Sequence, residues 1–174
     1  MNLAAAAPLW LAIALCCAML AAAIEDALRL RISNVTSLAV LIGAVVAAVV
    51  EGPSLALWQN GVVFLAILVL GTAAFSAGLL GGGDVKLFAA TGLWFDFRSA
   101  VWFVALVFIS GGLVALCYLL ARPFRRSAGG KKERRIPYGI AIALGAMALV
   151  LLERGYFRHQ ERPLSSFTSI EHRS

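Results

Sequence analysis

Six intervals of this chain carry no charged residue at all: 1–24, 33–50, 52–83, 87–95, 99–121 and 136–152. Apolar side chains make up 61% of the residues and charged ones only 14%, where soluble domains carry about a quarter. A chain of 174 residues hides only about 70% of the surface that its unfolded form exposes, so a water-soluble fold cannot bury this much apolar surface. The intervals predict an all-α membrane protein, a bundle of about six transmembrane helices.

The lengths of the intervals decide which of them can cross a bilayer. A spanning helix needs about 20 mainly apolar residues. The first, third and fifth intervals are long enough, and the second and sixth are slightly short. The fourth is the doubtful one, because even over 85–97 a helix rises only about 20 Å.

The basic residues indicate the orientation. Segment 122–135 holds seven basic residues and one acidic residue, which is typical of a cytoplasmic loop. If all six intervals cross, most other basic linker residues fall on the same side, and both termini lie outside. We therefore predict a transmembrane domain over 1–152 and a polar, disordered tail over 153–174. The net charge of +6 is interpreted as a topology signal, so we expect the lipid bilayer and no nucleic acid as a partner.

Two aspartates stand at the ends of predicted spans. Asp26 ends the first and Asp84 begins the fourth, with two spans between them. An even number of crossings returns the chain to the same face, so both carboxylates are expected at the cytoplasmic edge. Ionisable groups at membrane depth cost about 2.5–3.5 kcal/mol at a helix centre, which favours a functional role. The alternative is that they are interfacial charges paired with Arg29 and Lys86.

A close pair of carboxylates can catalyse hydrolysis. Only one of them ionises cheaply, so the charged one can act as general base on a water and the protonated one as acid toward a carbonyl. This chemistry needs no metal or cofactor, and we expect none. The two histidines lie in the predicted tail, and the three cysteines form no Cys-x-x-Cys pair.

Three glycines, 81–83, precede Asp84. Each costs a helix about 1 kcal/mol relative to alanine, but the run lets another backbone come close. It also leaves Asp84 near a helix start, where the helix dipole favours a carboxylate.

Three stretches resemble the prepilin peptidases, also called type IV leader peptidases. Segment 81–92 resembles their Gly-x-Gly-Asp-x-Lys signature, with matches at Gly81, Gly83, Asp84 and Lys86. Segment 26–34 resembles their other aspartate site, which ends in Ile-Pro-Asn. Here the matches are Asp26, Ile32 and Asn34, and Ser33 replaces the usual proline, which leaves the shape of that turn open. Segment 135–145 resembles the opening of their last span and contains Pro137, Tyr138 and Gly139.

The resemblance implies a membrane aspartic endopeptidase of the Gly-x-Gly-Asp type that removes the basic leader of prepilins at the cytoplasmic face of the bacterial inner membrane. Asp26 and Asp84 would be catalytic. The other matched residues would support the site or bind substrate: Gly81, Gly83, Lys86, Asn34, Pro137, Tyr138 and Gly139. The short length is typical of members that act on Flp or Tad-type pilins without methylating them, and the pilus assembly machinery is a further expected partner.

Two other interpretations stay open. A presenilin-like or preflagellin-type protease shares the Gly-x-Gly-Asp element. From another class, a small transporter or an inactive scaffold could use the aspartates as an ion site.

Overall fold

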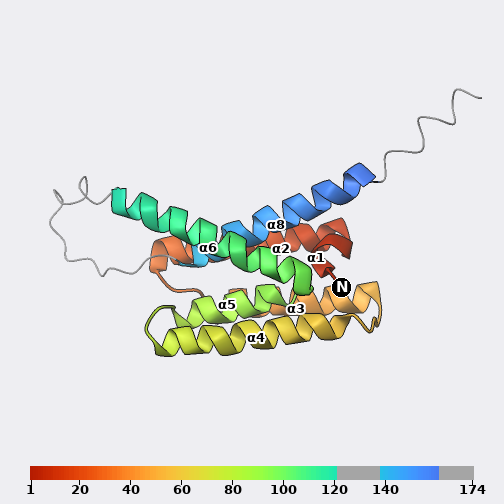
Figure 1. Cartoon of the computed structure of the whole chain (residues 1–174), viewed down its shortest axis with the longest axis horizontal. Coiled ribbons are helices and arrows are strands. Elements are labelled where there is room, and N and C mark those ends of the chain that lie inside the picture. Colours follow the sequence, from red (N-terminus) through yellow and green to blue (C-terminus); the bar gives the residue numbers. More distant parts are fainter. Residues whose placement is uncertain (121–137, 161–174) are drawn as a thin grey trace, which may run out of the picture.

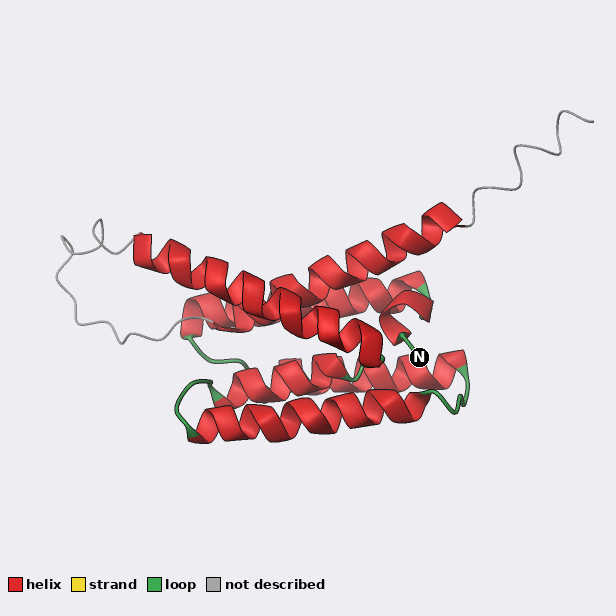
Figure 2. Cartoon of the chain, viewed as in Figure 1, coloured by secondary structure: helices red, strands yellow, loops and turns green. Residues whose placement is uncertain are grey.

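The structure, a computed structural model, describes residues 1–120 and 138–160. The regular elements in these two ranges are all helices: α1 Leu3–Ala6, α2 Leu9–Arg29, α3 Asn34–Glu51, α4 Leu57–Ser76, α5 Gly82–Gly92, α6 Phe97–Leu120 and α8 Tyr138–Gln160. Figure 2 shows them joined by loops and turns, with no strand drawn in the described ranges. The predicted all-α fold class is confirmed. The predicted basic loop at 122–135 and Pro137 lie outside the described residues.

Five helices are long and apolar enough to cross a membrane: α2, α3, α4, α6 and α8. Large apolar side chains remain exposed on their outer faces, among them Val69, Phe108 and Leu151. An apolar surface this extensive is costly in water but suits lipid chains, which need no hydrogen bonds from the protein. The chain is a multi-pass membrane protein.

The doubtful fourth interval forms α5, which has only 11 residues and rises about 16 Å. It nevertheless packs antiparallel to α4, beside part of that helix. The residue after its end, Leu93, accepts a hydrogen bond through its carbonyl oxygen from the Asn60 side chain, in the first turn of α4, at 3.0 Å. The chain thus returns along α4 by means of a short helix and a turn. A sixth complete crossing stays a prediction.

The first interval contains two helices instead of one. Pro8 separates them and stands as the N-cap of α2, where its missing N–H costs no hydrogen bond. The short α1 lies against the end of α5, and its Ala4 N–H donates to the Trp94 carbonyl at 3.2 Å. α1 therefore covers the end of the bundle that the short α5 leaves open.

The last helix is longer than predicted. The sequence places a polar tail from residue 153, whereas α8 continues to Gln160. Glu153 accepts hydrogen bonds from Asn2 and Ser99, and Arg154 donates to the carbonyl oxygens of Ala4 and Ala7. These long-range contacts stabilise the helical conformation of the polar turn that contains Glu153 and Arg154. Residues 161–174 of the predicted tail lie outside the described part.

Close helix packing depends on small residues. A Cβ on Gly71 of α4 would lie 2.9 Å from Val85 Cγ1 of α5, and one on Gly145 of α8 would lie 2.9 Å from the Val107 backbone nitrogen of α6. Glycine at these points lets neighbouring helices approach each other closely, as membrane helices commonly do.

The chain direction brings several helix ends together. The carboxyl ends of α2 and α4 and the amino ends of α5 and α8 lie at one end of the bundle, at the left of Figure 1. α1 and the connection between α3 and α4 lie at the other end. The first end carries the two aspartates.

Candidate active site

Asp26 lies in the last turns of α2 and is only 4% exposed. One turn later comes Leu30, the C-cap residue of α2, whose backbone is in the left-handed conformation with φ 51°. Its N–H donates to the Asp26 carbonyl oxygen at 2.9 Å. The carboxylate Oδ2 of Asp26 accepts the backbone N–H of Gly139 at 2.7 Å. Gly139 is the second residue of α8. The unsatisfied N–H groups of a helix start attract negative charge, so α8 stabilises an ionised Asp26.

Asp84 is the third residue of α5. Its Oδ2 accepts the N–H of Gly81, the N-cap residue, at 3.1 Å. A carboxylate that reaches back from the first turn to the N-cap residue satisfies a donor which the helix itself cannot. Asp84 thus lies at the positive end of a helix, as Asp26 does.

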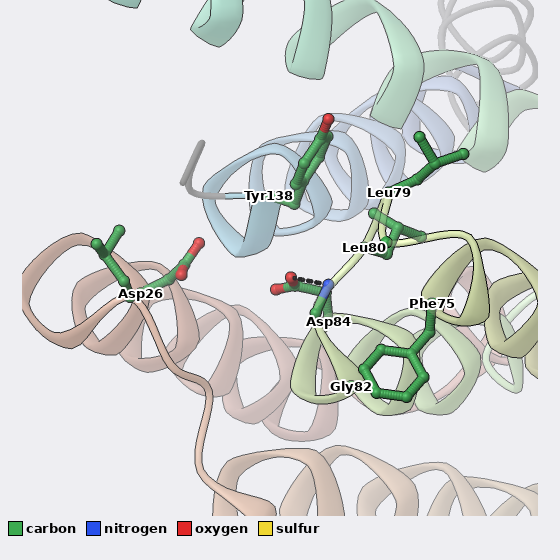
Figure 3. A pocket seen from close by; sticks show the side chains of 10 residues that line it. Asp26, Phe75, Leu79, Leu80, Gly82, Asp84 and Tyr138 are labelled. Atoms are coloured by element: carbon green, nitrogen blue, oxygen red, sulfur yellow. Dashed lines mark hydrogen bonds between the residues drawn. The ribbon is translucent and has the colours of Figure 1, made fainter. Parts of the chain in front are cut away.

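The two carboxylates line one open cavity of about 490 Å³. They come from different helices and point into the same space, with the half-buried Tyr138 ring beside them (Figure 3). The structure therefore brings together two residues that are far apart in the sequence.

The two cations nearest to the aspartates in sequence lie outside this cavity. Lys86 donates from Nζ to the side-chain oxygen of Asn34 at 2.9 Å and so links α5 to the first residue of α3. Arg29 lines a separate hollow of about 440 Å³ at the linker between α2 and α3. Lys86 and Asn34 thus support the site by holding two elements together, and neither contributes to the cavity wall.

The glycines around the cavity differ in how closely an added Cβ atom would approach its neighbours. A Cβ on Gly81 would lie 2.7 Å from Asp84 Oδ2, and one on Gly83 would lie 3.1 Å from the Ile32 carbonyl oxygen. On Gly139 it would lie 2.8 Å from Asp26 Oδ2. On Gly82 the nearest atom is at 3.6 Å, an ordinary contact. Within the run 81–83, the two glycines that match the signature are therefore the two at which a Cβ would be crowded.

The family model described as the type IV leader peptidase family matches residues 13–116. The chain belongs to the type IV leader peptidase family. Comparisons with curated proteins and with solved structures gave no match. Membership of this family supports a role as a protease that removes the leader of type IV prepilins.

Asp26 and Asp84 fall inside the matched range, and α8 falls outside it. Tyr138 and Gly139 complete the cavity from α8: Tyr138 lines it and Gly139 holds Asp26. Pro137, which was predicted with them, lies outside the described residues.

Sequence reasoning missed the connection between α4 and α5. One edge of the cavity, called the apolar lip below, is formed by Phe75 at the end of α4 and by Gly78, Leu79 and Leu80 of the connection. Gly78 has φ +74°, a conformation that side chains rarely adopt. This glycine, three residues before the glycine run, is the signal that could have indicated an ordered turn at the site.

The backbone conformation of Ser33 defines the turn that follows Asp26. Its φ of −73° and ψ of 148° are values that proline adopts, so the extended conformation is compatible with either residue. Ser33 is the N-cap of α3, and its hydroxyl accepts the Thr36 N–H at 3.1 Å. Its own N–H donates to Glu25 Oε2 at 3.0 Å, a bond that proline cannot make. A capping serine is recognisable in sequence, but its partnership with Glu25 is not.

Proposed function

We propose that this member of the family is an aspartic endopeptidase in which Asp26 and Asp84 are the catalytic pair. The observation that carries the proposal is their convergence on one open cavity, each at the positive end of a helix and each held by a backbone N–H. Catalytic groups need to be held in place before substrate arrives, and hydrogen bonds from helix starts provide such support.

The pair would cleave a peptide bond with a single shared proton. The ionised carboxylate takes a proton from a water molecule, whose oxygen attacks the carbonyl carbon of the scissile bond. The protonated carboxyl gives its proton to the carbonyl oxygen, which yields a tetrahedral diol. The C–N bond then breaks as the nitrogen accepts the proton that the pair holds. At the same time one hydroxyl of the diol gives its proton to the other carboxylate and becomes the carbonyl oxygen of the product, so the pair is left with one proton again.

The substrate that fits this place is a prepilin, with a basic leader in water and an apolar helix in lipid. Leu79 and Leu80 border the cavity on the apolar side, and the scissile bond would lie between this lip and the aspartates. The connections that form the cavity wall are not helical, so an extended substrate backbone can pass beside them. Flp or Tad-type pilins are the proposed substrates, and the pilus assembly machinery is the proposed further partner.

The cavity would open on the cytoplasmic side of the bacterial inner membrane. Segment 122–135, with its seven basic residues, directly precedes α8, whose first residues contact Asp26. Short loops rich in lysine and arginine stay in the cytoplasm. The leader of a newly made prepilin lies on that same side.

The proposal is tested by cleavage of a co-expressed prepilin-like protein, followed by its change in mass. Asp26→Asn and Asp84→Asn should each lower the rate at least 10²-fold, toward the roughly 10²–10⁴-fold contribution of general acid–base catalysis. Glu51→Gln, at the opposite end of the bundle, is the control and should cleave normally. Each variant must be present in the membrane at the wild-type level. Normal cleavage by either aspartate variant rules the proposal out.

A further inference from the structure

Glu25 precedes Asp26 on α2 but faces away from the cavity. Consecutive residues of a helix point about 100° apart, so the two carboxylates face different sides of α2. Glu25 lines the separate hollow at the linker between α2 and α3 and not the cavity that holds Asp26. Its Oε2 accepts the Ser33 N–H at 3.0 Å and the Thr36 hydroxyl at 2.9 Å.

These bonds form a closed network. The Thr36 hydroxyl gives its proton to Glu25, so the Ser33 hydroxyl donates to the Thr36 oxygen at 2.9 Å while it accepts the Thr36 N–H at 3.1 Å. Thr36 is buried, and Glu25 and Ser33 are half-buried. The end of α2 is thereby fixed to the start of α3 across the four linker residues.

Ile32, the residue before Ser33, lies between the two halves of the active site. Its carbonyl oxygen is 3.1 Å from where a Gly83 Cβ would stand, next to Asp84. Its Cδ1 is 2.7 Å from where a Gly139 Cβ would stand, on the residue that holds Asp26. Ile32 is 9% exposed. A shift of this residue would therefore move the start of α5, the start of α8, or both.

We propose that Glu25 is a positioning residue: by holding Ser33 and Thr36 it keeps Ile32 wedged between Gly83 and Gly139 and so sets the separation of the two catalytic carboxylates. This inference rests on the proposed function. Lys86 of α5 donates to Asn34, the first residue of α3, and so also holds the end of this linker. In this scheme Glu25 contacts no substrate atom and takes no part in proton transfer.

The chain offers a way to replace the Glu25 bond with a covalent restraint. Ser33 has the φ of a prolyl residue, so Ser33→Pro keeps the backbone path while removing the N–H that Glu25 accepts. In the Ser33→Pro variant the proline ring restrains the linker, so the hydrogen bonds of Glu25 are needed less. If Glu25 is a positioning residue, the effects of Glu25→Ala and Ser33→Pro on kcat should therefore not be additive.

The experiment measures kcat and KM for prepilin cleavage with the full chain in vesicles, together with the thermal unfolding temperature of each variant. Glu25→Ala should lower kcat about 10–100-fold and change KM less than about threefold, because misplacement by about 1 Å affects the chemical step and not binding. Glu25→Gln retains an acceptor oxygen and should stay within about threefold of wild type. In the Ser33→Pro background, Glu25→Ala should cost less than about threefold.

Three outcomes overturn the inference. One is a wild-type kcat for Glu25→Ala. Another is an equal loss in Glu25→Gln and Glu25→Ala with a raised KM, which would mean that the negative charge binds the basic leader. The third is an undiminished effect of Glu25→Ala beside Ser33→Pro. If Glu25→Ala does not fold, Thr36→Val removes one of the two bonds to Glu25 and should lower kcat about 3–10-fold, and an unchanged kcat again overturns it.

Failure of the inference and failure of the proposed function are distinguishable. Asp26→Asn and Asp84→Asn report on the proposed function alone. If both are inactive while Glu25→Ala is fully active, the aspartic mechanism stands and the positioning role falls. Glu51→Ala, which removes an acidic side chain at the other end of α3, is the matched control and should leave kcat and KM unchanged.

Discussion

Three consecutive glycines before Asp84 have different surroundings, and the difference separates a structural requirement from a tolerated residue. Gly81 has φ −79° and ψ 146°, a conformation open to any residue, so backbone freedom does not explain it. The space around it does, because a Cβ there would push against the Asp84 carboxylate. Gly83 is restricted in the same way by the Ile32 backbone, whereas Gly82 meets only the edge of the Phe75 ring.

Alanine at these glycines should therefore affect cleavage unequally. Gly81→Ala and Gly83→Ala should each lower the prepilin cleavage rate about 10–100-fold, because each displaces Asp84 or the helix start that carries it. Gly82→Ala should stay within about threefold of wild type and gain slightly in helix stability. Initial rates on one prepilin substrate, at matched protein levels, measure this. Equal loss in all three variants would show that the run is needed for flexibility and not for close approach.

The sequence predicts some of the site residues and not others, for a physical reason. Asp26 and Asp84 can be assigned to one end of the bundle by counting crossings, and Gly81, Gly83 and Lys86 by their match to a signature. Glu25 cannot be assigned in this way. Its partners lie 8 and 11 residues ahead, beyond the end of its own helix, and only the packed turn brings them together.

At the level of helices, α5 depends on its neighbours more than the long helices do. With 11 residues it is shorter than the length at which isolated helices are stable in water. It packs into α4 at Gly71 and, from its own Gly92, against Ile67. The turn that follows it is fixed by Trp94, whose indole N–H donates to the Val40 carbonyl of α3 at 3.1 Å. The position of Asp84 therefore depends on how closely α4 and α5 approach each other.

A larger residue at this contact should destabilise the protein and move Asp84. Gly71→Leu forces a side chain into Val85 and should cost about 1–3 kcal/mol, the usual range for overpacking. It should also lower the cleavage rate. Gly61→Leu on the same helix has open space around its Cβ and is the matched control. Thermal unfolding in detergent measures the difference, and similar unfolding temperatures for the two variants would contradict the packing argument.

Charge-free intervals predict that helices exist better than they predict where helices end. The interval 33–50 corresponds to α3 within one residue at each end, because a capping serine and Glu51 mark its limits. The interval 1–24 fails to show the break at Pro8, and α2 continues through Glu25 and Asp26 to Arg29. The extension of α8 to Gln160 rests on Glu153 and Arg154 contacts with α1 and α6, which no local pattern reveals.

For the whole molecule, the orientation in the membrane decides whether the cavity can meet a newly made prepilin. The connection between α3 and α4 and the connection between α4 and α5 lie at opposite ends of the bundle (Figure 1). Leu55 of the first is 96% exposed and Leu79 of the second is 66% exposed. Cysteine at these two positions therefore reports on the two faces of the membrane.

The expected result is labelling from opposite sides. In a chain whose three cysteines are replaced by alanine, Leu55→Cys should react with a membrane-impermeant maleimide on intact cells, and Leu79→Cys only in inverted membrane vesicles. The positive-inside rule gives the reason, because the basic segment 122–135 precedes the helix that contacts Asp26. The cysteine-free parent must still cleave prepilin. Since Leu79 lines the cavity, its labelling should also block cleavage in the vesicles, and Leu55 labelling should not. Reaction of Leu79→Cys on intact cells would place the cavity outside, where no uncleaved leader is available, and would exclude the proposed site of action.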